Sequence, residues 1–302
     1  MTTSSSHPPL AAWAGVLWLV LAALALRLLV EAFRFLPCWA IPVAVVVLAY
    51  PIWVGIRESS LFNRRMILQG ATLEDASIRR LMWPGTIGSI LRIIPALAFA
   101  ALLLASGTLL GFQAWGLVFS DALLLVLLHQ GMQRLWAGQV RPEMLGALVR
   151  RWPLQITNLG ILALAFFLLN FFLLGAPDLR LLDWKQVAED AFRAQSQGLT
   201  CPLAGWLVGA LSAWDQGSWA LAQRLIPGLP AHGLRLLAWA LYLAQLSLFS
   251  LIVTRLYLGV LAWVEYRKLR LEALTGSSTL EKTFIITILV LLVPTLLLSL
   301  SV

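Results

Sequence analysis

Ionisable and amide side chains interrupt several long apolar stretches of the sequence, and these are the residues that could do chemistry. One stretch holds Asp121 and His129, eight residues apart. On a helix this spacing places both on one face, about two turns or ~12 Å apart, which suits a relay through water. Two later stretches add amides and an arginine. The sequence therefore predicts a polar seam made of Asp121, His129, Asn158, Asn170 and Arg255. We expect these groups mainly to hydrogen-bond the helices together, at about 0.6 kcal/mol each, with a transport path as the alternative.

A second ionisable group lies near the end of the first apolar stretch. Arg27, Glu31 and Arg34 follow one another at i, i+4 and i+7, so they share one helix face. Glu31 can pair with both arginines, which makes the group nearly self-neutralising. We expect it to fix a helix end against its neighbours, with an ion path as the alternative.

Motifs for catalysis or metal binding do not stand out in the chain. The three histidines, His7, His129 and His232, have neither zinc nor haem spacing. Nucleophile-elbow, phosphate-loop and HExxH motifs are missing from the sequence. We therefore predict no catalytic residue, no metal and no cofactor, and the interpretation leans away from an enzyme.

The composition says what kind of fold must position these residues. Of the 302 residues, 60% are hydrophobic and 12% are charged, whereas soluble domains carry about 25% charged residues. The net charge of +8 would suggest a nucleic-acid partner in a soluble protein, but here the basic residues gather at the ends of apolar runs. The predicted fold is an all-α integral membrane protein, a polytopic helical bundle in contact with membrane lipids and not with nucleic acid.

Membrane-spanning helices need roughly 20 mostly apolar residues. Seven runs meet this length, after a disordered tail over 1–9, and they place residues 10–302 in a single transmembrane domain. The runs are 10–35, 38–56, 86–110, 115–137, 153–175, 235–263 and 281–301. Residues 203–225 are long enough for an eighth, but Asp215 would then lie near the bilayer midplane, at a cost of about 2.5–3.5 kcal/mol. We prefer an interfacial or re-entrant helix there.

Basic residues set the expected orientation. With the N-terminus inside, three Arg-rich connections fall on the cytoplasmic side, while the helical segment 177–234 lies outside. The inner connection 57–85 reads as an amphipathic segment that contacts anionic lipid or a protein partner. The predicted face for that lipid or partner consists of Arg64, Arg65, Arg79, Arg80, Arg150 and Arg151. The composition indicates a bacterial inner membrane.

The two cysteines, Cys38 and Cys201, fall on the same outer side in this arrangement. An oxidising compartment would allow them to form a disulfide, and two unrelated thiols are the alternative.

Three functional hypotheses follow from this placement. The first is a non-catalytic inner-membrane subunit of a larger transport or secretion assembly, with other subunits at its basic cytoplasmic face. The second is a self-contained channel or transporter that uses the polar seam. The third is a membrane enzyme acting on a lipid-linked substrate near Asp183, Glu189, Asp215 and His232.

Overall fold

The computed structural model describes residues 9–71, 90–140, 142–173 and 177–269, and every regular element in those ranges is a helix. Five helical stretches in this part of the chain are long and apolar enough to cross a membrane. Four of them lie in α1 (Pro9–Phe33), α2 (Ala40–Ala71), α6 (Phe112–Trp136) and α11 (His232–Leu269). The other is the run Met144–Leu173, which joins most of α7 (Pro142–Arg151) to α8 (Pro153–Leu168) and the short π-helix that follows it. The prediction of an all-α protein with several candidate membrane spans is therefore confirmed, whereas the predicted count of seven is not. The predicted last span, 281–301, lies outside the described residues.

Two predicted boundaries differ from the observed helices. The prediction ended the second span at residue 56, whereas α2 continues to Ala71. The added residues are polar enough to end an apolar run, but Arg, Glu, Leu, Met and Gln are good helix formers, so the helix need not stop with the hydrophobicity. The third predicted span, 86–110, contains α5 (Ile93–Gly107), whose 15 residues are fewer than the roughly 20 of a complete crossing.

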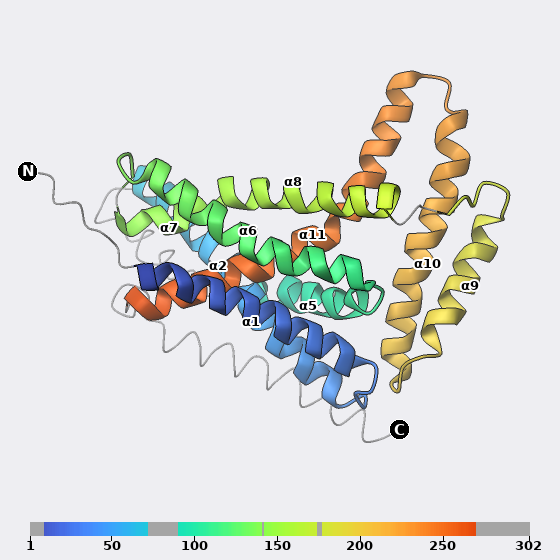
Figure 1. Ribbon diagram of the computed structural model, residues 1–302, viewed down its shortest axis with the longest axis horizontal. Coiled ribbons are helices and arrows are strands. Elements are labelled where there is room, and N and C mark those ends of the chain that lie inside the picture. The colour runs from blue at the N-terminus through green and yellow to red at the C-terminus, as the bar shows by residue number, and fades with distance from the viewer. Residues whose placement is uncertain (1–8, 72–89, 141, 174–176, 270–302) are drawn as a thin grey trace, which may run out of the picture.

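The long helices form an elongated bundle with two distinct ends (Figure 1). At one end lie the turn between α1 and α2 and the turn between α5 and α6; we call it the disulfide end because Cys38 is there. At the other end lies α7 (Pro142–Arg151), which carries Arg150 and Arg151. We call it the arginine end.

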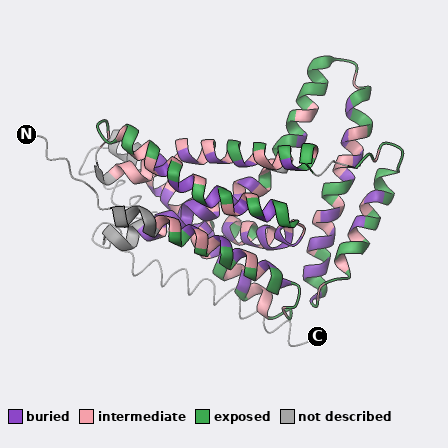
Figure 2. Cartoon of the chain, in the orientation of Figure 1, coloured by how far each residue is buried: buried purple, intermediate pink, exposed green. Residues whose placement is uncertain are grey.

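The closest helix contact inside the bundle is the crossing of α2 and α11. A Cβ on Gly259 would lie 1.8 Å from the carbonyl oxygen of Pro51, and one on Gly55 would lie 3.1 Å from the Cα of Gly259. Only glycine allows this approach, which brings a Cα hydrogen toward a carbonyl oxygen, as is common where membrane helices cross. Fully buried Trp53 and Tyr257 pack beside the crossing, where Figure 2 shows buried residues on the facing sides of the helices.

A helical hairpin lies across the disulfide end of the bundle (Figure 1). It consists of α9 (Trp184–Ser196), with Asp183 capping its first turn, and α10 (Pro202–Leu225), with Pro202 at the first helical position. Glycines of α10 again allow close packing. A Cβ on Gly205 would lie 2.4 Å from the carbonyl oxygen of Ser196, and one on Gly209 would lie 2.9 Å from that of Phe192.

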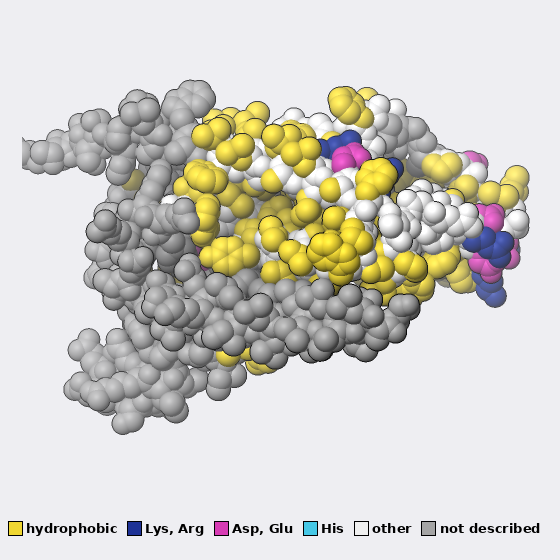
Figure 3. Space-filling view, turned by 90° about the horizontal axis from the view of Figure 1, so that it is seen from below, with side chains coloured by type: hydrophobic (Ala, Val, Ile, Leu, Met, Phe, Trp, Pro, Cys, Tyr) yellow, Lys and Arg dark blue, Asp and Glu magenta, His cyan; other side chains and the backbone are white. Residues whose placement is uncertain are grey.

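The surface of the hairpin differs from that of the bundle. Hydrophobic side chains cover most of the described surface in Figure 3, and charged ones gather at the hairpin end, with another group over the bundle. On α9 the exposed residues include Lys185, Glu189, Asp190 and Arg193. On α10 they include the large apolar residues Leu203, Trp206 and Trp214. The hairpin therefore has a polar face on α9 and an apolar face on α10.

We predict that Gly259→Ala lowers the thermal unfolding temperature of the detergent-solubilised protein. The added methyl overlaps backbone atoms of α2, and overpacking of this kind costs about 1–3 kcal/mol. The matched control is Gly160→Ala in α8, where nothing lies within 4 Å of the added Cβ. Equal unfolding temperatures for the two variants would contradict the close α2–α11 crossing.

Candidate functional site

A buried hydrogen-bonded cluster joins three of the long helices. The Asn158 amide nitrogen on α8 donates to the Asp121 carboxylate on α6 at 3.2 Å and to the Thr254 hydroxyl on α11 at 3.1 Å. The three residues are 0–4% exposed. One turn along α11, the Tyr257 hydroxyl donates to the Val118 carbonyl oxygen of α6 at 2.9 Å. Two members of the predicted seam, Asp121 and Asn158, are thus in direct contact.

The remaining predicted members of the seam lie elsewhere. His129 is buried two turns along α6 and contacts the Gln133 side-chain nitrogen at 3.3 Å. Asn170 is exposed in the short π-helix η1 (Leu169–Leu173), where it contacts none of the cluster. Arg255 lines a cleft at the arginine end. Its neighbour Thr254 contacts Asn158 instead, because one residue turns the side chain by about 100° around the helix.

The cluster retains polar atoms without partners. Among the described residues, the second oxygen of Asp121, the side-chain oxygen of Asn158 and the Ser250 hydroxyl have no hydrogen-bond partner. Ser250 is 1% exposed and lies one helical turn before Thr254. Unpaired polar atoms in such a place cost free energy.

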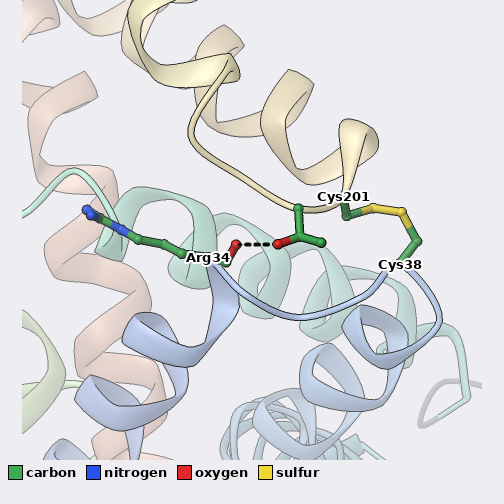
Figure 4. Close-up of a disulfide and its surroundings, with 4 residues drawn as sticks. Arg34, Cys38 and Cys201 are labelled. Atoms are coloured by element: carbon green, nitrogen blue, oxygen red, sulfur yellow. Dashed lines mark hydrogen bonds between the residues drawn. A yellow bond between two sulfur atoms is a disulfide. The ribbon is translucent and has the colours of Figure 1, made fainter.

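At the disulfide end, Arg34 connects three chain segments. Its backbone carbonyl accepts hydrogen bonds from the Thr200 backbone nitrogen at 3.1 Å and from the Thr200 hydroxyl at 3.2 Å. Its guanidinium donates to the Thr108 carbonyl oxygen at 3.0 Å. Figure 4 shows this arrangement beside the disulfide that joins Cys38 to Cys201 with an S–S distance of 1.96 Å. The α9–α10 hairpin is therefore attached to the bundle covalently and through the backbone.

The predicted Arg27–Glu31–Arg34 group separates in the structure. Arg27 and Glu31 form an ion pair within one helix face, and the Arg27 guanidinium lies 4.9 Å from the ring centre of Trp115. Arg34 turns instead to the Thr108 carbonyl oxygen. The separation has a simple cause: Glu31 is 49% exposed by side chain and one partner satisfies it, whereas the turn before α6 offers Arg34 a backbone acceptor.

The structure corrects part of the prediction of a basic face for lipid or a partner. Arg150 is 6% exposed and forms a two-point ion pair with Glu58 of α2, with its Nε 3.1 Å from a carboxylate oxygen. It is thus a buried link between α2 and α7 and not part of an open face. Arg151 is partly exposed, with its guanidinium 5.4 Å from the ring centre of Phe62. The side chains of Arg64 and Arg65, and all of Arg79 and Arg80, lie outside the described residues.

Of the residues of the enzyme hypothesis, Asp183, Glu189 and Asp215 lie on the α9–α10 hairpin, and His232 lies at the start of α11. Asp183 caps α9, Glu189 pairs with Arg193 on the same helix, and His232 begins α11. Within the described ranges, no three His, Cys, Asp or Glu side chains are grouped as a metal site would need. Comparison with protein-family models, curated proteins and solved structures finds no match to this chain. The functional argument therefore depends on the geometry.

We predict that Asn158→Ala destabilises the protein, because it removes the donor that satisfies both Asp121 and Thr254. A buried polar group left without its partner costs about 1–3 kcal/mol, which thermal unfolding in detergent would detect. Asn170→Ala provides the control, since Asn170 is exposed. The cluster would lose its structural importance if both variants unfolded at the wild-type temperature.

We also predict that unreduced protein yields a cross-linked peptide containing Cys38 and Cys201 in mass spectrometry. The chain has two cysteines, so the assignment is unambiguous. The double variant Cys38→Ser/Cys201→Ser should lose stability on the scale of about 2–4 kcal/mol that such bridges contribute. Free thiols at both positions in freshly prepared membranes would argue against the bridge.

Proposed function

We propose that the protein is a non-catalytic subunit of a larger transport or secretion assembly in a bacterial inner membrane, with the arginine end in the cytoplasm. The observation that carries this proposal is the α9–α10 hairpin, which the Cys38–Cys201 bridge and the Arg34–Thr200 hydrogen bonds attach to the membrane bundle. Such a unit adds no chemistry of its own, but it offers a fixed surface to other proteins.

Two independent chemical arguments support the orientation. Arginines at helix ends favour the cytoplasmic side of a membrane, and disulfides persist in oxidising compartments such as the periplasm. The buried Arg150 and the Cys38–Cys201 bridge lie at opposite ends of the bundle. Both arguments therefore favour the arginine end in the cytoplasm and the disulfide end outside. Seven spans with a cytoplasmic N-terminus would be consistent with this orientation.

The far end of the hairpin supports a role in assembly. A small aromatic cluster made of Phe171, Trp219, Trp239 and Tyr242 joins the end of α10 to the start of α11. Beyond this cluster the two helices project from the bundle as an arm (Figure 1). Its exposed apolar residues include Leu225, Leu234, Leu236 and Leu237. A partner helix in the membrane would cover them.

A transporter is the alternative that one observation favours. Asp121 is buried between three helices, and one of its oxygens lacks a hydrogen-bond partner within the described residues, as a proton or ion site would require. The position of the other predicted seam residues argues against a transporter, because His129, Asn170 and Arg255 do not contact the Asp121–Asn158 pair. In proteoliposomes, Asp121→Asn would abolish ion or substrate flux if this alternative holds, and would leave the co-purifying proteins unchanged if it does not.

The assembly role predicts a discrete protein crosslink from the arm in native membranes. A photo-crosslinking amino acid at Leu237 should capture one membrane protein that also co-purifies with the unmodified chain after mild solubilisation. Leu164 on α8 is the matched control, since both leucines are 57% exposed, but Leu164 lies on the side of the bundle and should contact lipid. A chain that is always alone and monodisperse, with no protein crosslink at Leu237, would contradict the proposal.

A further inference from the structure

Helices α2, α7 and α11 meet around a cleft at the arginine end. Its polar lining comes from Glu58 and Ser59 on α2, Arg150 and Arg151 on α7, and Arg255 on α11. Three guanidinium groups and one carboxylate give the lining a net charge of +2. Glu58 is already paired with Arg150 at two points. Among the described residues of the lining, two positive charges therefore remain without a compensating carboxylate.

The two remaining arginines have unused hydrogen-bonding capacity. Within the part of the chain that the structure describes, Arg255 makes no hydrogen bond or ion pair, and the buried Nε of Arg151 has no acceptor. The guanidinium of Arg151 instead lies over the rings of Phe62 and Trp152. Cations of like charge held together at the edge of a low-dielectric bundle are costly unless an anion joins them.

We propose that this cleft binds a phosphate group, held by Arg151 and Arg255 while the Glu58–Arg150 pair fixes the wall between them. Guanidinium forks match the tetrahedral oxygens of phosphate, which accepts several charge-assisted hydrogen bonds at once. The cleft is narrow and open on one side, so phosphate oxygens enter it while the rest of the ligand stays outside. Phospholipid headgroups supply such a group at a membrane boundary, and free phosphate supplies the same chemistry from water. This inference does not depend on the assembly role.

The close packing of α2 on α11 contributes to the lining of this cleft. Gly55 lines it, and a Cβ on Gly55 would lie 3.3 Å from the backbone oxygen of Arg255. The glycine contact thereby holds Arg255 close to the helix that carries Glu58. A site whose cations are fixed by backbone packing needs little reorganisation when the anion arrives, which favours binding.

The test uses the full-length, unreduced protein in detergent, measured by native mass spectrometry with added phosphatidylglycerol or phosphatidylcholine. We expect retention of phosphatidylglycerol over phosphatidylcholine, and at least about a tenfold weaker retention in Arg255→Gln and Arg151→Gln, the scale of one lost charge-assisted hydrogen bond. The control Arg193→Gln removes the same charge from the exposed face of α9 and should bind as wild type. Arg255→Lys, which keeps the charge but not the fork, should be intermediate.

A second arm separates the two sources of the phosphate. Inorganic phosphate is titrated while thermal unfolding is followed, with unchanged helical content as the check that each variant folds. Stabilisation by inorganic phosphate that Arg255→Gln abolishes would support the cleft with a soluble ligand, and lipid retention alone would support it with a headgroup. The proposal is overturned if neither ligand distinguishes Arg255→Gln from Arg193→Gln. Crosslinking at Leu237 is unaffected by either result, so the two proposals can fail separately.

Discussion

The attachment of the α9–α10 hairpin to the bundle is the constraint on which the rest of the arrangement depends. The hairpin follows α8 and precedes α11, so its position determines where α11 enters the bundle. The Cys38–Cys201 bridge joins residues 163 positions apart, and the Arg34 carbonyl holds the adjacent backbone of Thr200. A covalent tie of this length removes much of the conformational freedom of the unfolded chain, and the hydrogen bonds fix the orientation that a single bond leaves free.

Inside the bundle, a second constraint acts on every polar side chain. Lipid offers no hydrogen bonds, so each buried polar group must find a partner on a neighbouring helix. The Asn158 amide supplies both Asp121 and Thr254 and so specifies how α6, α8 and α11 are rotated about their axes. The Glu58–Arg150 pair does the same for α2 and α7. Gly55 and Gly259 have no side chain that could form a hydrogen bond, and the small size of glycine allows α2 and α11 to pack closely instead.

The sequence patterns predict where most of the long helices lie, but they do not predict the contacts between those helices. Apolar run length places the ends of α1 and α6 within three residues, because the bilayer thickness determines that length. By contrast, α8 ends seven residues before the predicted span, and α11 extends six residues beyond it. The sequence places Asp121 and Asn158 in one polar seam, and the structure adds that they contact each other directly. The Glu58–Arg150 pair is not predicted, since it depends on helix crossings that one sequence does not display. The close approach at Gly259 has a visible signal, a glycine in an apolar helix, but its partner Pro51 has none.

The most direct test of the account is the side of the membrane on which the two cysteines lie. Intact cells would be treated with a membrane-impermeant maleimide, with and without an impermeant reductant, and the chain then isolated for mass spectrometry. Because the chain has two cysteines, we predict no labelling without reduction and labelling of both Cys38 and Cys201 from outside after it. Labelling that needs permeabilised cells but no reductant would place free thiols in the cytoplasm and contradict the orientation, the bridge and the proposed role of the arginine end.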